Sequence, residues 1–165
     1  MIRVDQAIID KSFGDCQRAV YASLLELPLD AVPNFIRHGI RFNMVLRGFL
    51  ATCGWKLDYI TGHFYKDMST YAEGFENKYK RPQIDTGIGG YFAASVKSRT
   101  YEHTNHCVVI NINGLVVHDP NPNKLYQGIN IIDTEELKHW DLVSVRNDKE
   151  WDAWKGYELG RGKNE

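Results

Sequence analysis

The sequence predicts an α+β domain in which helices come first and an antiparallel β-sheet follows. Apolar residues recur at helical spacing in residues 1–54, whereas β-branched residues gather in short runs within residues 88–146. A length of 165 residues, 43% of them hydrophobic, suits one domain spanning 1–165 around a single core. We therefore expect a mostly helical half, 1–54, packed on a sheet half, 88–146.

The charge balance argues against two classes of partner. Twenty basic and 21 acidic residues leave a formal net charge of −1, whereas nucleic-acid and membrane surfaces select for an excess of Lys and Arg. We therefore expect neither partner, and the oligomeric state stays open. The three cysteines lack metal-ligand spacing, so we expect no disulfide framework, metal or other cofactor. Neither a signal-peptide pattern nor an apolar run of about eighteen residues occurs, which favours a cytoplasmic location.

The first predicted helix covers residues 15–27, where apolar residues form one wide face. Asp15 is of a type that caps helix N-termini. Pro28 is expected to end the helix because proline cannot continue the hydrogen-bond ladder. Asp30 is then expected to cap one further helical turn.

A second helix is predicted over residues 36–52, where apolar residues that include Ile40 keep a nearly helical period. Gly54 should end it, since glycine is the usual residue after a helix. Alternation over residues 55–60 predicts a short strand. The aromatic stretch 63–80 is interpreted as an amphipathic helix or as a lid over the site.

The second half is rich in strand signals. Asn113-Gly114 is a typical hairpin turn. A two-residue turn there would pair Ile112 with Leu115 and Ile110 with Val117. The predicted strands are residues 91–96, 105–112, 115–118 and 142–145.

Cys16 is the first candidate for chemistry. It opens the predicted helix, and the positive end of a helix dipole favours thiolate over thiol. A thiolate is the form of cysteine that attacks a carbonyl carbon. The alternative interpretation is a small buried core thiol, which is the more common role of a cysteine.

His106 and Asp119 are the candidates for a base and its orienting acid. In the predicted hairpin register Val108 lies opposite Asp119, and His106 lies one diagonal step away. A carboxylate there can fix the imidazole tautomer and stabilise the imidazolium. The alternative is a structural histidine. Cys107 should face away from His106 and pack in the core.

Two neighbours of these residues are given structural roles. His118 should point to the opposite face of its strand from Asp119, at the surface or in a second layer. Gln17 follows the cysteine and is expected on the helix surface.

Three short motifs carry a resemblance to a known family: Gly14-Asp15-Cys16, Asn105-His106-Cys107-Val108-Val109 and His118-Asp119-Pro120. Together they resemble the papain-like cysteine peptidase superfamily, especially the branch of bacteriocin-processing peptidase domains of export transporters. Residues 22–35, 90–98 and 118–122 are also similar to segments of small uncharacterised bacterial and phage proteins. The resemblance covers residues 6–145.

The resemblance implies a papain-like fold and a cysteine hydrolase, a peptidase or isopeptidase that cleaves an amide bond of a peptide or protein substrate. It implies that Cys16 is the nucleophile, His106 the general base and Asp119 its orienting acid. Gln6 would be the oxyanion donor, as the only glutamine before Cys16. A phage-encoded protein of this kind would act in the host cytoplasm.

Two other functions remain open. One is hydrolysis of a non-peptide amide or an acyl transfer on the same fold, because a fold does not determine a reaction. The other is a catalytically silent binding protein of a phage or bacterium. Reactivity of Cys16 at low pH would distinguish an enzyme from a binding protein.

Overall fold

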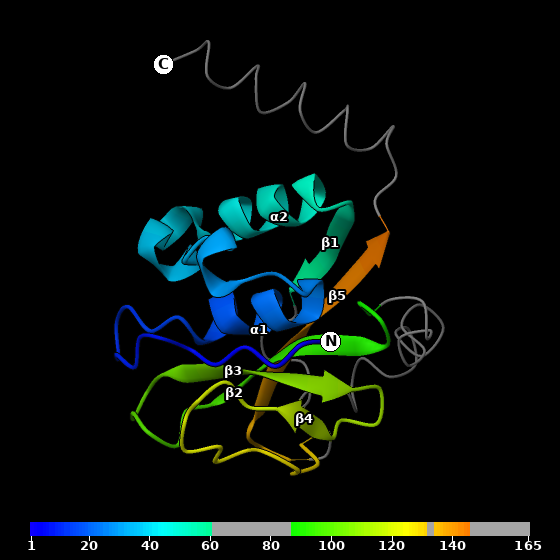
Figure 1. The fold of residues 1–165 in the computed structure, drawn as a ribbon. Coiled ribbons are helices and arrows are strands. Elements are labelled where there is room, and N and C mark those ends of the chain that lie inside the picture. The colour runs from blue at the N-terminus through cyan, green and yellow to red at the C-terminus, as the bar shows by residue number, and fades with distance from the viewer. Residues whose placement is uncertain (61–86, 132–133, 146–165) are drawn as a thin grey trace, which may run out of the picture.

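The computed structural model describes residues 1–60, 87–131 and 134–145. Helices precede most of the sheet, so the α+β prediction is confirmed (Figure 1). The predicted segment 63–80 lies outside the described residues. In chain order the elements are the helices α1 (Cys16–Leu25), η1 (Leu29–Ala31), η2 (Phe35–Arg41) and α2 (Phe42–Thr52), and the strands β1 (Trp55–Ile60), β2 (Tyr91–Lys97), β3 (Asn105–Asn111), β4 (Val116–His118) and β5 (Leu137–Val145).

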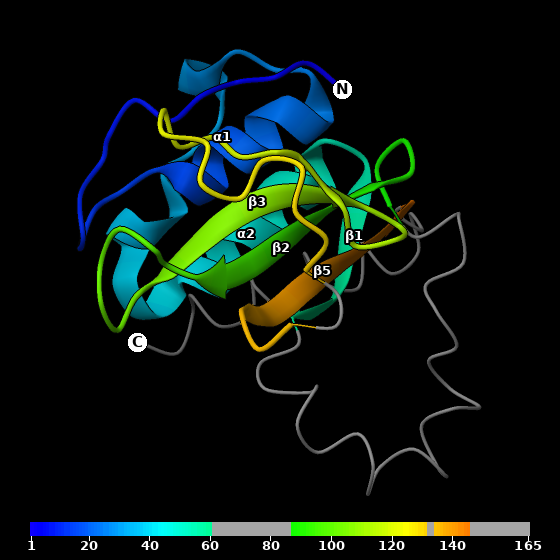
Figure 2. The same cartoon turned by 90° about the horizontal axis from the view of Figure 1, so that it is seen from below.

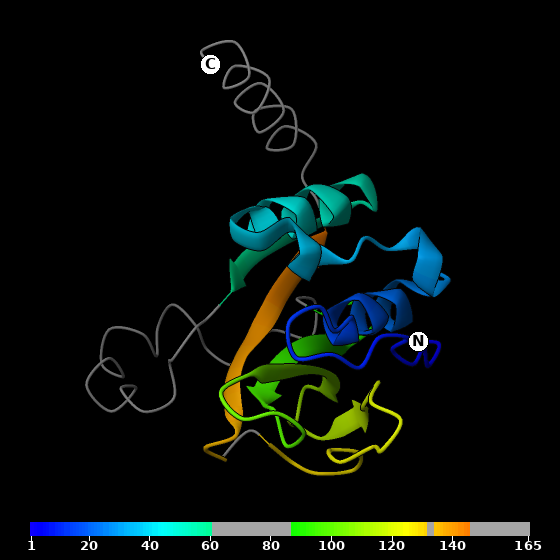
Figure 3. The same cartoon turned by 90° about the vertical axis from the view of Figure 1, so that its left-hand side faces the viewer.

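The sheet has five strands in the order β1-β5-β2-β3-β4, and every neighbouring pair is antiparallel. The prediction confined the sheet to the second half of the chain. The structure adds β1 from the first half, which pairs with one half of the long strand β5. Figure 3 shows β5 running from β2 up to β1. This strand begins at Leu137 rather than at residue 142 as predicted.

The two faces of the sheet are covered differently. Helices α1 and α2 lie on one face, where their apolar residues pack against Ala93, Val109 and Val143 (Figure 1). On the other face the loop after β4 crosses β2 and β3 (Figure 2). Tyr126 and Ile131 of that loop are buried against Phe92, Val108 and their neighbours. This loop begins at Asp119, so core packing holds the acidic residue in place.

Helix α1 begins where predicted but ends earlier. Asp15 occupies the N-cap position, but its side chain makes no cap hydrogen bond. The helix ends at Leu25, earlier than the predicted end at residue 27, because Glu26 takes a left-handed conformation with φ of 56°. Asp30 lies inside η1 and caps nothing, since Pro28 precedes that turn.

The second predicted helix is broken near its start. Gly39 has φ of 52° and separates a 3-10 stretch, η2, from the regular helix α2. Ile40 is fully exposed, so including it in the apolar face was wrong. The C-terminal end at Thr52 and the strand β1 agree with the prediction. Among the described residues no helix is both long and apolar enough to span a membrane.

The hairpin of β3 and β4 has a shifted register near its turn. Val109 pairs with His118, in line with the prediction, but Ile110 pairs with Val116 instead of Val117. At the turn, the side chain of Asn111 accepts the backbone N–H groups of Asn113 and Leu115. The predicted register therefore survives only at the end of the hairpin near Asp119.

Candidate active site

Cys16 is the first residue of α1 and is 9% exposed. The chain before it is held by Asp15, whose carboxylate accepts the N–H of Ile8 at 2.8 Å. The backbone N–H of Asp15 donates in return to the Ile8 carbonyl at 3.3 Å. Asp15 thus ties the N-terminal segment to the start of the helix, in place of the capping role expected from its position.

Gly14 is required by a close backbone approach. A Cβ at this position would lie 2.6 Å from the carbonyl oxygen of Asp10, a distance that would force the backbone to move. The same carbonyl accepts the N–H of Gly14. The turn that delivers Cys16 to the helix is therefore tight, and its geometry depends on the missing side chain.

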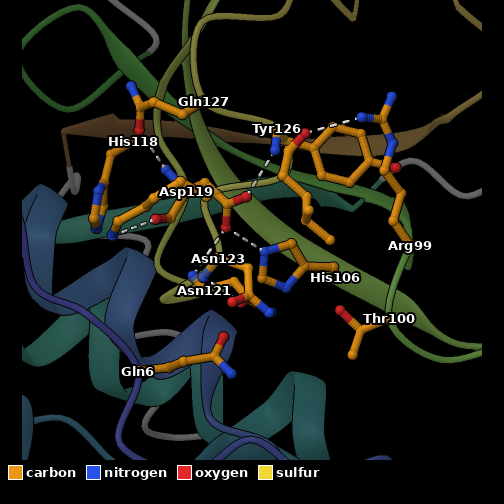
Figure 4. Close-up of polar contacts among 12 residues, drawn as sticks. Gln6, Arg99, Thr100, His106, His118, Asp119, Asn121, Asn123, Tyr126 and Gln127 are labelled. Carbon is orange, nitrogen blue, oxygen red and sulfur yellow. Dashed lines mark hydrogen bonds and ion pairs between the residues drawn. The ribbon is translucent and has the colours of Figure 1, made fainter.

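His106 and Asp119 form a buried pair. Nε2 of His106, at the start of β3, lies 2.7 Å from Oδ1 of Asp119, just after β4. Asp119 is fully buried and accepts the backbone N–H groups of Asn121 and Tyr126, each at 2.9 Å (Figure 4). Burial alone would raise the pKa of Asp119, but the hydrogen bonds from His106 and these N–H groups bring it below its usual value.

Cys16 interacts with the same imidazole. Burial lowers the pKa of His106, but hydrogen bonding to Asp119 and to Cys16, and the charges of both, raise it to about 9. The pKa of Cys16 lies well below its ordinary value. The interaction with the Cys107 thiol lowers it most, and hydrogen bonding to His106 and the charge of His106 lower it further. Because Nε2 of His106 is engaged by Asp119, Nδ1 is the nitrogen left for Cys16. The expected charge state is a thiolate beside an imidazolium.

Cys107 has a part that its sequence position did not predict. It packs in the core cluster under α1, as expected from strand alternation. Interaction with the Cys16 sulfur, together with burial, raises the pKa of Cys107 well above its ordinary value. Cys107 is therefore expected to stay protonated beside Cys16. Its position next to His106 in sequence was the signal available, but strand alternation alone pointed only to packing.

A buried acid lies deeper in the same core. The phenol of Tyr21, on α1, donates to the carboxyl group of Asp141 on β5. Burial raises the pKa of Asp141 to about 7, although the bond from Tyr21 lowers it. The charge of Asp141 contributes to the raised pKa of Cys107. No sequence pattern indicated this pair, because 120 residues separate its members.

Gln6 lies beside the site on the N-terminal segment. Its backbone N–H donates to the Pro120 carbonyl at 3.0 Å, next to Asp119 in sequence. Its side-chain Nε2 donates to the Ile8 carbonyl at 3.3 Å, while Oε1 is buried without a hydrogen-bond partner among the described residues. An amide nitrogen has a second N–H, so Gln6 retains one donor for a developing oxyanion.

One pocket contains Gln6, Cys16 and His106. The turn between β2 and β3 and the start of β3 contribute polar residues to its lining. The N-terminal segment contributes Ile9, and η2 contributes Ile36. The remaining lining residues are Asp10, Lys11, Gly14, Ser98, Thr100, Tyr101, Thr104, Asn105 and Asn121. The predicted site residues thus come together, with Asp119 directly behind His106.

Two residues next to the site in sequence, Gln17 and His118, are both buried. Gln17 is buried rather than on the helix surface, because α1 is covered on more than its apolar face. His118 follows the second of its two predicted alternatives, a second-layer position rather than the surface: it is 1% exposed, and its Nε2 donates to the Val4 carbonyl at 2.9 Å. His118 thereby ties the end of β4 to the N-terminal segment.

Asp119→Ala is expected to reduce the reactivity of Cys16 at pH 6 about 10- to 100-fold, since a buried hydrogen bond to a charged group contributes roughly 1.5–3 kcal/mol. Without the carboxylate, the imidazolium loses its partner and the pKa of His106 falls. The measurement is the rate of alkylation by iodoacetamide. Asp30→Ala, which removes an exposed carboxylate of η1, is the matched control. Equal rates in the two variants would contradict a role for Asp119.

Within residues 1–60, 87–131 and 134–145, no cluster of three or more His, Cys, Asp or Glu side chains could hold a metal ion.

Comparison with known proteins found no matching family model, no matching curated protein and no matching solved structure. The geometry of the site is therefore the basis for its functional interpretation.

Proposed function

We propose that this protein is a cysteine hydrolase, a peptidase or isopeptidase of papain-like type that acts on a peptide or protein in the cytoplasm. The observation that carries the proposal is the 2.7 Å contact between His106 Nε2 and Asp119, in a pocket that also contains Cys16. The contact leaves Nδ1 for the sulfur and orients the imidazole as a base for it. The resemblance of the three motifs to papain-like peptidases supports the same conclusion.

In the first half of the reaction, the Cys16 thiolate attacks the carbonyl carbon of the scissile amide. The carbonyl π electrons move to oxygen, and the backbone N–H of Cys16 and Nε2 of Gln6 donate to that oxyanion. The C–N bond then breaks as the oxyanion electrons return, and His106 gives its proton to the leaving nitrogen. The products are a free amine, a neutral His106 and a thioester on Cys16.

In the second half, water replaces the amine. Neutral His106 takes a proton from water as the water oxygen attacks the thioester carbon. Collapse of this intermediate breaks the C–S bond, releases the carboxylic acid and restores the thiolate beside the imidazolium. Asp119 keeps His106 in one tautomer through both halves.

The deciding experiment is site-resolved alkylation of the three cysteines by iodoacetamide. Cys16 should react at pH 6 well before Cys53 and Cys107, because only the thiolate attacks. Of the two thiols at the site, Cys16 has a lowered pKa and Cys107 a raised one. Mass spectrometry of the digested protein measures each rate. Equal slow labelling of all three would favour the silent binding protein.

A second experiment distinguishes the substrate classes. Covalent capture of Cys16 by a peptidyl chloromethyl ketone, but not by a non-peptide analogue, would favour a peptidase over a small-molecule amidase.

A further inference from the structure

The side chain of Tyr126 lies against the imidazole of His106. The two rings are 6.4 Å apart between centroids and inclined by 25°, in a stacked arrangement. The backbone N–H of Tyr126 also donates to Oδ2 of Asp119 at 2.9 Å. Tyr126 is 1% exposed, so it contacts both members of the buried pair without itself facing solvent.

Arg99, in the turn after β2, contacts the Tyr126 ring. Its guanidinium carbon is 4.2 Å from the ring centroid, within the range of a cation–π interaction (Figure 4). Its Nη1 donates to the Leu125 carbonyl at 2.9 Å. Arg99 therefore holds both the ring of Tyr126 and the backbone directly before it.

The guanidinium is itself held by an acid from a third segment. Nε and Nη2 of Arg99 donate to the two carboxylate oxygens of Glu136, at 3.0 and 2.8 Å. Glu136 directly precedes β5, and its carbonyl accepts the N–H of Lys97. A two-pronged pair of this kind fixes the plane of the guanidinium, which a single contact would not do.

These contacts connect the turn after β2 with the loop that begins at Asp119, two segments that must stay aligned for the proposed reaction. Arg99 belongs to the turn after β2, which supplies Ser98, Thr100 and Tyr101 to the pocket. Tyr126 belongs to the loop that begins with Asp119. The hydroxyl of Tyr126 donates to the Lys97 carbonyl at 2.5 Å, which adds a second connection between the two segments.

We propose that Arg99, fixed by Glu136, is a positioning residue that acts through Tyr126 to keep His106 aligned with Asp119. This inference rests on the proposed function, because alignment matters only if His106 exchanges protons with Cys16. Arg99 itself touches no reacting atom. When it is removed, the Tyr126 ring and the backbone at Asp119 gain freedom, and the hydrogen bond of His106 weakens.

The test is the titration of His106 followed by NMR in protein with carbon-13-labelled histidine. Loss of alignment in Arg99→Gln should weaken the bond to Asp119 and lower the pKa of His106, a change of about three- to tenfold in its protonation constant. Simple loss of a positive charge predicts the opposite sign, because removing a nearby cation favours imidazolium. Arg99→Lys should give a smaller decrease, since it keeps the charge but not the two-pronged pair. Arg47→Gln, at an exposed arginine of α2, is the control.

The outcomes separate the two proposals. An unchanged or raised pKa of His106 in Arg99→Gln would overturn the positioning role, even if the melting temperature fell. A lowered pKa in Arg99→Gln would support it, whatever the protein hydrolyses. By contrast, a wild-type Cys16 that is not alkylated at pH 6 would overturn the proposed function alone. Glu136→Gln must lower the pKa in the same direction as Arg99→Gln, and failure to do so would contradict the part assigned to Glu136.

Discussion

Cys16→Ala should abolish hydrolysis, with a loss of at least about four powers of ten in kcat/KM. The reason is that the proposed reaction passes through a thioester on this sulfur, and no other thiol is placed to replace it. Cys107 interacts with Cys16, but its raised pKa keeps it protonated. The measurement is turnover of a peptide substrate found by covalent capture on the wild-type protein.

Cys53→Ala is the matched control for the nucleophile. Cys53 directly follows α2 and is half-buried, so the same atoms are removed from a site without a base. Its turnover should stay within about twofold of the wild-type value, as expected for substitutions away from reacting groups. Full activity in Cys16→Ala, with a circular dichroism spectrum and a melting temperature like those of the wild type, would refute the proposed mechanism.

His106→Gln is expected to have the next largest effect, a loss of about three to four powers of ten in turnover. The variant removes the proton donor for the leaving nitrogen and the cation that stabilises the thiolate. The Cys16 thiol then loses one of the two groups that lower its pKa, so its alkylation at pH 6 should slow as well. In the wild type, turnover should decline above about pH 9, where His106 loses its proton. His103→Gln, at an exposed histidine of the turn before β3, is the control.

The same residue predicts how stability depends on pH. The pKa of His106 is raised from an ordinary value of 6.5 to about 9 in the folded protein. Its protonated form therefore stabilises the fold, fully below about pH 6.5 and progressively less as the pH rises to about 9. Cys16 is removed in both proteins compared, because its own titration acts in the opposite sense. The difference in melting temperature between Cys16→Ala and Cys16→Ala/His106→Gln should accordingly shrink between pH 6.5 and 9.5. A difference that grows over this range would contradict the imidazolium assignment.

Several features of the site follow from short-range patterns. The alternation of residues 105–111 and the turn at Gly114 predicted a hairpin that ends near Asp119, and β3 and β4 form it. The start of a helix at Cys16 also followed from a local apolar period. Such patterns succeed because they encode the backbone conformation of adjacent residues, which side-chain sterics and turn chemistry largely set. The pairing of His106 with Asp119, 13 residues apart, is close to the limit of this reasoning.

Other features depend on contacts that no local pattern contains. Strand β1 pairs with β5 across most of the chain, and Tyr21 finds Asp141 at a similar separation. Cys107 was correctly placed on the core face, yet only the packing of α1 on β3 brings its thiol to Cys16. The same packing buries Gln17, which the helical period had left at the surface.

By itself, the sequence determined the α+β class, the order of the main elements and the positions of Cys16, His106 and Asp119 at element ends. Tertiary structure alone decided that the cysteine and histidine share a pocket, that Cys107 interacts with Cys16 and that Arg99 reaches Tyr126. The physical reason is that local conformation is chosen by neighbouring residues, whereas a proton shared between distant side chains depends on how whole layers pack and exclude water.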